Sequence, residues 1–459
     1  MNYCRINPGM PHMKALFKYN FMRNVFFIVA FFASVATTQA QTRLLTVEEA
    51  VATALQNNYD IQIARNDSMV AALDYSYRDL AFFPTLNATG GVIFNNNNQR
   101  QTLADGTKRE QKGIRSNNTA AAVQLDWVLF DGFRMFATRD KAAEFVTLGE
   151  YTIRNQVVNT ISTVVTTYYN IVRQKQQIKA TDEQIVLNEE RVRLSQYKLD
   201  IGTGIKPDVL QSRVDLNAQK ALKLEQLALV DQLKEQLNQL MNVKSRTNFD
   251  VSDSIPLNTT IALGDMQEGV DSTSPALLLA RKNVDIARLT LRERKADLLP
   301  VISFNSAYNF SKTDNKTVIN PFSPLFNQSN GLNYGLSASI PIFNRLNGRR
   351  LVRQARLDIN YQQLVYENQR SLVNLNILNA FQNYEQKKQA LALEEENILL
   401  ARENVDIVLQ TYRLGAATLI QLREAQSSLE LANNRLIAAR YDTKLAETEL
   451  LRLRGTLGR

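Results

Sequence analysis

The chain contains the same structural unit twice, in tandem. Matching residues recur 216 positions later near the start of each unit and 213 positions later through the rest of it. The matched pairs include Ala64/Ala280, Arg65/Arg281, Pro84/Pro300, Phe130/Phe343, Gly202/Gly415 and Leu240/Leu453. An offset that stays this constant indicates an internal repeat. Each unit has two short segments of alternating polarity and two long segments of helical pattern, so we expect one elongated molecule rather than several compact domains.

Residues 1–40 are predicted to be a secretory signal peptide. An apolar run covers residues 25–36, with Arg23 before it and the small Ala40 after it. The run is too short to cross a bilayer, which takes about 20 residues, but it suits the apolar core of a signal. We expect translation to start at Met22 or Met13 and cleavage to leave Gln41 first. The alternative is a buried core helix.

Loss of residues 1–40 would change the chemistry available to the chain. Cys4 and His12 are the only residues of their kinds and would both be removed, together with four basic residues. Zinc, copper and haem sites and most nucleophilic triads need a thiol or an imidazole. Of the charged residues, 50 basic and 45 acidic ones would remain, mixed along the helices. We therefore predict no metal, no cofactor, no enzyme activity and no nucleic-acid partner.

Four segments have the alternation of a strand with one apolar face. They lie at about 86–95, 120–129, 301–311 and 332–342. In the third segment Ile302, Phe304, Tyr308 and Phe310 share one face. Segments of roughly ten residues with period two are typical of lipid-facing barrel strands. A soluble sandwich is the alternative, although four strands are few for one. The connections 96–119 and 312–331 are polar and predicted to be long loops.

Four strands cannot close a membrane barrel, because the smallest barrels use about eight. An open sheet edge is not tolerated in lipid, so several subunits must pool their strands. Two chains would give a barrel filled by side chains, whereas three would give twelve strands and the beginning of a lumen. The long helices favour a lumen. We therefore predict a homotrimer with a 12-stranded barrel on an α-helical tunnel, mostly α with a β-barrel part.

Two very long helices carry an apolar residue at every seventh position. The first, about 132–199, contains no proline and would reach about 100 Å. Its predicted core positions are Val157, Val164, Ile171, Ile178, Ile185, Val192 and Leu199. Those of the second copy are Ile377, Tyr384, Leu391, Ile398, Val405 and Tyr412. A sustained period of seven indicates left-handed coiling against partner helices, here the return helices at about 208–242 and 419–454.

Each helical pair turns at a short tip. The first tip, about 200–207, contains Gly202, Thr203 and Gly204 before Pro207, which suits the first turn of a helix. At the second tip, about 413–418, Gly415 and Ala416 precede Thr418, which has capping-box spacing to Gln421. The predicted organisation is a first repeat at 41–242, an equatorial linker at 243–273, a second repeat at 274–455 and a tail at 456–459.

Together these motifs resemble the TolC-type outer-membrane efflux channels. The resemblance covers residues 44–455 and rests on the opening L-T-V-E-E-A-V-A-T-A-L-Q-N-N, the prolines before the strands, the strand exits V-L-F-D-G and I-P-I-F-N, and the two tips. It implies a trimer in outer-membrane lipid, with its helices in the periplasm. The channel would be a passive exit duct of a tripartite efflux or type I secretion system and would dock a periplasmic adaptor and an inner-membrane transporter.

The resemblance also assigns residues at the tips. Asp208 and Tyr412 match the gate aspartate and tyrosine, and Gln421 and Glu424 match the acidic pair that lines the constriction. Ala417 stands where some members have an arginine, so a charged latch is not expected. Glu424 could form an acidic ring in a trimer, or lie on a solvated helix face.

The tip residues Gly202, Thr203, Gly204, Gly415 and Ala416 match the adaptor contact, although the glycines could simply end helices. Alternative functions are a soluble periplasmic coiled-coil adaptor or scaffold and a carboxylate-dependent enzyme. The sequence does not indicate which substrate is exported.

Overall fold

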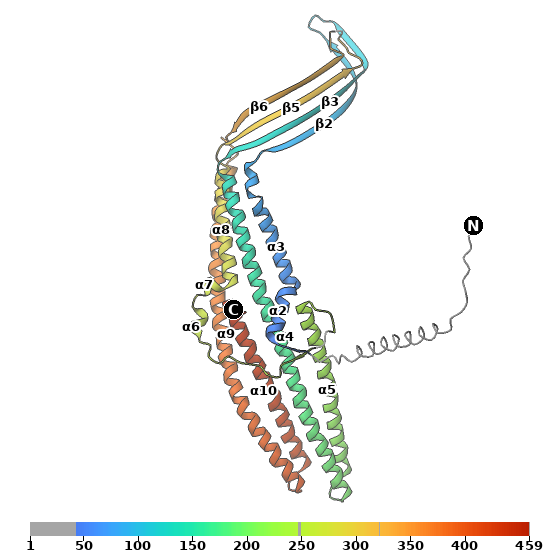
Figure 1. The fold of residues 1–459 in the computed structure, drawn as a ribbon, viewed down its shortest axis with the longest axis vertical. Coiled ribbons are helices and arrows are strands. Elements are labelled where there is room, and N and C mark those ends of the chain that lie inside the picture. The colour runs from blue at the N-terminus through green and yellow to red at the C-terminus, as the bar shows by residue number, and fades with distance from the viewer. Residues whose placement is uncertain (1–42, 247–248, 321, 459) are drawn as a thin grey trace, which may run out of the picture.

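A computed structural model describes residues 43–246, 249–320 and 322–458. The predicted signal peptide, residues 1–40, lies outside this range. The molecule is elongated, with a β-sheet at one end and long helices that run from the sheet to two tips at the other end (Figure 1). No helix within the described residues has the length and apolar character needed to cross a bilayer.

The two repeats share a helix, two strands, a long helix and a return helix in the same order, and the first repeat also contains α2 (Val47–Asn57) and η1 (Arg78–Phe82). The first consists of α2, α3 (Tyr59–Ser76), η1, β2 (Thr85–Thr102), β3 (Lys108–Asp131), α4 (Arg134–Asp200) and α5 (Lys206–Met241). The second consists of α8 (Pro275–Ala296), β5 (Val301–Asn315), β6 (Phe326–Ser339), α9 (Asn347–Arg413) and α10 (Leu419–Arg454). Helices α4 and α9 both have 67 residues, and α5 and α10 both have 36. The predicted repeat architecture and mostly helical fold are confirmed.

The four long strands form one antiparallel sheet in the order β2-β3-β5-β6. The register places Val123 opposite Tyr308, and Tyr308 opposite Leu332. Within the described residues, β2 and β6 are the two edges of this sheet and have no further strand beside them.

The strands differ in extent from the sequence prediction. The segment 96–119, predicted as a loop, is mostly paired strand, because β2 runs to Thr102 and β3 begins at Lys108. Backbone pairing needs no apolar alternation, so the ladder continues through polar residues. Strand β6 begins earlier than predicted, at Phe326, and ends at Ser339 rather than at 342. Pro341 follows closely and has no N–H to donate to a ladder.

A strap between the repeats crosses the helices near their middle. It contains β4 (Phe249–Val251), α6 (Leu263–Gln267) and α7 (Val270–Thr273), and β4 pairs in parallel with β1 (Arg43–Leu45). Two buried tyrosines hold the strap. The Tyr168 hydroxyl donates to the Leu45 carbonyl at 2.8 Å and accepts from the Ser252 N–H at 3.2 Å. The Tyr384 hydroxyl donates to the Asn258 carbonyl at 2.5 Å.

The seven-residue period predicts the core of the second hairpin well. Ile377, Tyr384, Leu391, Val405 and Tyr412 are buried, and only Ile398 is half-buried. In a coiled hairpin these positions face the partner helix. The apolar seam predicted for α9 is therefore confirmed.

In the first hairpin the predicted positions are less deeply buried, and in the half of α4 nearest the tip the fully buried positions are other residues. Val164 and Ile171 are buried, but Val157, Ile178, Ile185, Val192 and Leu199 are only half-buried. The buried positions there form a polar seam of Thr181, Gln184, Asn188, Arg191 and Ser195. Helix α4 contacts α10 as well as α5. The centre of its buried face therefore lies between these two helices, and it does not coincide with the apolar stripe of α4.

Candidate functional site at the helical tips

Both hairpins end in the same hydrogen-bonded turn. Gly202 and Gly415 have left-handed φ values of 78° and 81°. The N–H groups of Gly202 and Thr203 donate to Leu199 and Lys198 at 3.0 and 2.9 Å. At the second tip those of Gly415 and Ala416 donate to Tyr412 and Thr411 at 3.1 and 2.9 Å. This is the Schellman arrangement, which a glycine at the left-handed position favours.

The helices that return from the tips start differently. Helix α5 has Pro207 in its first turn, after a tight approach in which a Cβ on Gly204 would lie 2.9 Å from the Lys198 Cβ. Helix α10 starts with a capping box. The Gln421 side-chain oxygen accepts from the Thr418 N–H at 2.9 Å, and Thr418 Oγ1 accepts from the Gln421 N–H at 3.3 Å. Gln421 therefore caps α10, as its capping-box spacing to Thr418 predicted.

Tyr412 connects the second hairpin to the first. Its ring is buried at the end of α9, and its hydroxyl lies 3.3 Å from Ser195 Oγ, which itself lies 3.3 Å from Ser212 Oγ. The Lys198 ammonium donates to the Tyr412 carbonyl at 2.7 Å and lies 3.6 Å from the centre of the ring. A cation over an aromatic face is an attractive contact, so α9 is fastened to α4 at this point.

Asp208 lies in the same pocket but is not joined to Tyr412. The pocket, of about 590 Å³, lies between the two tips and is lined by Lys198, Asp208 and Tyr412 among others. No hydrogen bond links the Asp208 carboxylate to Tyr412 within the described residues. Burial lowers the pKa of Lys198, and the negative charge of Asp208 opposes that shift.

Three further predicted site residues lie on the surface of the second tip. Gln421, Glu424 and Ala416 are all exposed. Glu424 lies three residues after Gln421 on the outward face of α10 and forms no ion pair within the described part of the chain. The structure thus brings Asp208 and Tyr412 together in one pocket and places Glu424 on an open surface.

A buried charged cluster further from the tips was not predicted. Arg191, only 2% exposed, is paired with Asp215 of α5 at 2.7 Å and donates to the Gln426 side-chain oxygen of α10 at 2.8 Å. Arg423 of α10 also contacts Asp215, at 3.2 Å. Burial lowers the pKa of the Arg191 guanidinium, and the Asp215 carboxylate opposes this. The cluster joins α4, α5 and α10.

Several polar atoms around this cluster remain unpaired. Within the described residues, Gln184 Nε2, Arg191 Nε, Gln219 Oε1 and Gln426 Nε2 are buried without a hydrogen-bond partner. Such groups destabilise the arrangement in which they are found. A signal for the seam was present in the sequence, because its polar residues are spaced by three and four, as core positions of a coiled coil are.

The fold matches known outer-membrane channels. A structure described as the outer-membrane channel OprN has a TM-score of 0.74 at 18% identity and covers 89% of this chain and 90% of that one. A structure of CusC, described in terms of transmembrane channel formation, has a TM-score of 0.73 at 16% identity and covers 91% and 95%. The fold is therefore that of an outer-membrane channel subunit.

The sequence comparisons show the family. A model of the outer membrane efflux protein family matches residues 50–243 and 270–456, and the chain belongs to that family. Outer membrane protein TolC of Escherichia coli strain K12 is 23% identical over 366 residues, covering 76% of this chain and 72% of TolC. Alkaline protease secretion protein AprF of Pseudomonas aeruginosa is 22% identical over 439 residues, covering 90% and 87%.

Family membership decides between the alternatives left by the sequence. The protein is an outer-membrane channel of the efflux and secretion type, with its helical part in the periplasm, and not a soluble adaptor or scaffold. The family consists of channel proteins rather than enzymes. Within the described residues, no group of three or more His, Cys, Asp or Glu side chains is placed to hold a metal ion.

Proposed function

We propose that three copies of the chain form a 12-stranded barrel in the outer membrane, continuous with a hollow helical shaft in the periplasm. The assembly is a passive exit duct. A periplasmic adaptor and an inner-membrane transporter deliver substrates to its tip, and the substrates leave without chemical change.

The open sheet is the observation that carries this proposal. Within the described residues it has two unpaired edges, β2 and β6, and many of its apolar side chains are exposed. Leu332, Tyr334 and Leu336 of β6 are 61%, 75% and 71% exposed. Unpaired backbone groups at an edge cost several kcal/mol each in lipid. The edges must therefore be paired with other subunits when the sheet enters the membrane.

The helical layer below the sheet supports the same closure. Its helices contact one another in the order α3–α4–α8–α9, so α3 and α9 are its edges and lie on opposite sides of the layer (Figure 1). Both edges expose apolar residues, namely Val70, Leu73 and Tyr77 on the first and Leu357, Tyr361 and Leu364 on the second. A cyclic assembly joins one edge to the other at each interface.

We further propose that the tips form the gate. Asp208, Tyr412, Gln421 and Glu424 would line the constriction, with Glu424 contributing one carboxylate per subunit. In the closed state, the contacts of Tyr412 with Ser195 and Lys198 hold the second hairpin against the first. Opening would release these contacts. The adaptor would meet the exposed turns at Gly202, Thr203, Gly204, Gly415 and Ala416.

Engineered disulfides would test the barrel and its subunit number. After signal cleavage the protein has no cysteine of its own, so cysteines introduced in pairs along the edges, at Ala88, Gly90 or Val92 of β2 and at Tyr334 or Leu336 of β6, can only link those edges. Oxidation in membranes should give bands up to a trimer and no larger. A ladder that stops at the dimer would indicate an eight-stranded barrel, and absence of any crosslink would overturn the proposal.

Bulky side chains at the tips would test adaptor docking. Ala416→Trp and Thr203→Trp place an indole on an exposed turn without changing a left-handed glycine. We expect pump-dependent resistance to be lost while the amount of trimer in the outer membrane stays normal. Asn434→Trp, on an exposed face in the middle of α10, is the control and should behave as wild type. Full resistance in the tip variants would show that the adaptor binds elsewhere.

A further inference from the structure

Five arginines gather where the second repeat leaves the sheet and enters the shaft. They are Arg345, Arg349, Arg350, Arg353 and Arg356. None is a feature of the repeat, because the residues 213 positions earlier are Gly132, Phe136, Ala137, Asp140 and Ala143. The cluster therefore belongs to the second copy alone.

The backbone and the helix both disfavour arginine at these places. Arg349 and Arg350 lie in the first turn of α9, where the helix dipole favours negative rather than positive charge. Arg345 has a left-handed φ of 54°, and its counterpart Gly132 adopts a similar φ of 71° without a side chain. A strained or misplaced charged residue points to a function outside the fold itself.

The cluster has no acidic partner within the described part of the chain. Arg350 donates to the side-chain oxygens of Asn347 and Gln354, and none of the five arginines forms an ion pair there. The basic residues at the same level of the first repeat do form ion pairs. Arg134 contacts Asp297 at 3.4 Å and Lys141 contacts Glu293 at 2.5 Å. The second repeat thus presents uncompensated positive charge.

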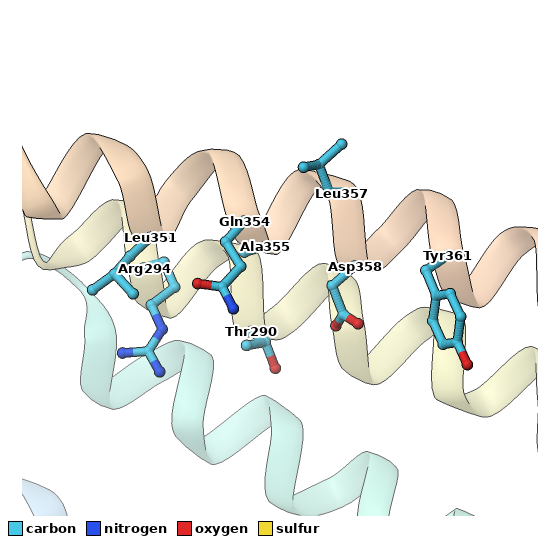
Figure 2. Close-up of a pocket in the computed structure, with 8 residues that line it drawn as sticks. All are labelled: Thr290, Arg294, Leu351, Gln354, Ala355, Leu357, Asp358 and Tyr361. Atoms are coloured by element: carbon cyan, nitrogen blue, oxygen red, sulfur yellow. The ribbon is translucent and has the colours of Figure 1, made fainter.

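Four of the arginines line a groove on one face of the helical layer. The groove, of about 550 Å³, is lined by Leu298, Leu346, Arg349, Arg350, Val352, Arg353 and Arg356, and we call it the arginine groove. Arg349, Arg353 and Arg356 follow one another on one side of α9. A different pocket, shown in Figure 2, contains Arg294, Gln354 and Asp358. Gly348, Val352 and Ala355, which are buried on α9, separate the two sides of the helix.

The groove adjoins apolar residues just below the end of the sheet. Strand β6 ends at Ser339, and Ile342, Phe343 and Leu346, which follow it, are 95%, 77% and 57% exposed. Apolar side chains beside long basic ones are typical of the boundary between lipid tails and water. This composition favours the outer surface of the shaft over the lumen.

We propose that the arginine groove binds the phosphate of phospholipid headgroups in the periplasmic leaflet of the outer membrane. Guanidinium groups match phosphate oxygens in pairs, and basic pockets at the ends of membrane segments bind anionic headgroups. Three such sites in the trimer would fix the depth at which the barrel sits. This inference rests on the proposed function, because the sheet must span the membrane for the groove to meet lipid.

Lipid binding by the purified, detergent-solubilised trimer tests the inference. Native mass spectrometry would compare phosphatidylglycerol with phosphatidylcholine of the same chains. The test variant combines Arg349→Gln, Arg353→Gln and Arg356→Gln. The control combines Arg134→Gln, Arg139→Gln and Arg292→Gln, which removes three exposed, ion-paired arginines from the same region.

We expect wild type and control to prefer phosphatidylglycerol, and the test variant to bind it about tenfold more weakly. An equal loss of phosphatidylglycerol binding in the control would show that net charge alone explains the effect. That result would overturn the inference. Displacement of the lipid by millimolar inorganic phosphate would assign the groove to free phosphate and would also overturn it.

Two further readouts separate other roles of the arginines. If the test variant lowers the temperature at which the trimer dissociates in dodecyl sulfate but leaves lipid binding intact, the arginines form a subunit contact. If it changes only single-channel conductance, they face the lumen. Either result overturns the inference. Wild-type protein that fails to insert into liposomes would overturn the proposed function and this inference together, whereas insertion without lipid preference would overturn this inference alone.

Discussion

The two hairpins have the same length and the same turn at the tip, but different interiors. In α9–α10 the seam is apolar, with Ile377, Tyr384 and Leu391 buried. In the lower part of α4–α5 it is polar and contains the Arg191–Asp215 ion pair. The difference follows from position, because α4 contacts α10 as well as α5. One fold thus accepts two kinds of seam, and the charged one lies where the hairpins meet.

Removal of Asp215 should have the largest effect. Asp215→Leu leaves the Arg191 charge buried without its carboxylate, which should lower the free energy of unfolding of the helical part by about 3–5 kcal/mol. Guanidinium titration of the purified protein in detergent, followed by helical circular dichroism, measures this loss. The matched change in the second hairpin is Ser428→Leu at an exposed site, which should shift stability by less than about 0.5 kcal/mol.

The double variant Arg191→Met with Asp215→Leu sharpens this prediction. Replacing both members of a buried pair by apolar residues is often neutral or stabilising, so most of the loss should be recovered. If the double variant is as unstable as Asp215→Leu alone, the cluster acts through packing rather than charge.

Alanine substitutions at equivalent positions of the two hairpins should show that the seam of α9–α10 is the more apolar one. Leu391→Ala removes a buried side chain and should cost about 2–4 kcal/mol. Its counterpart Ile178→Ala changes a half-buried position, so roughly half that loss is expected. Equal losses in the same denaturant assay would contradict the difference drawn between the two seams.

Alkaline pH should destabilise the part of the first hairpin that surrounds Tyr169. Burial raises the pKa of Tyr169 to about 12, so the folded state keeps the phenol neutral. The neutral Tyr169 side chain contributes its full stabilisation below pH 10, the pKa of tyrosine in the unfolded chain. This contribution declines as the pH rises towards about 12, the pKa in the folded chain. At pH 11 the loss should be about 1.4 kcal/mol relative to pH 8. Tyr169→Phe should abolish this part of the dependence. The second repeat has Gln382 at this position, which does not titrate.

The smallest change in stability is expected where the hairpins touch at the tips. Tyr412→Phe removes the hydroxyl contact with Ser195 and should cost about 0.5–1.5 kcal/mol. Combined with Asp208→Ala, it should raise single-channel conductance in planar bilayers, because the closed tip of the proposed gate would be less firmly held. Unchanged conductance would show that packing alone keeps the tip closed.

The sequence predicted those features that depend on local pattern. The offset between Gly202 and Gly415 located both turns, and the alternation around Phe304 located a strand. The family resemblance followed from the order of such motifs. These features could be found because left-handed turns and one-sided strands restrict residue type directly.

Features that depend on packing between distant segments were not predicted. Periodicity identified the apolar stripe through Ile185 and Val192, but not the rotation of α4 that buries Arg191 against two other helices. The pairing of β2 with β3 beyond Asn96 was missed because these segments are polar, although Asp105-Gly106, a typical hairpin turn, marks the point where the two strands join.

In the proposed trimer, the two sheet edges that are unpaired within the described residues would make each subunit dependent on its neighbours. A chain with one damaged edge can still join on its intact side, and it would then occupy a place in a ring that cannot close. In a cell that expresses both forms, defective copies would therefore spoil complexes containing normal ones. The loss of transport would exceed the defective share of the protein, and such alleles would be dominant.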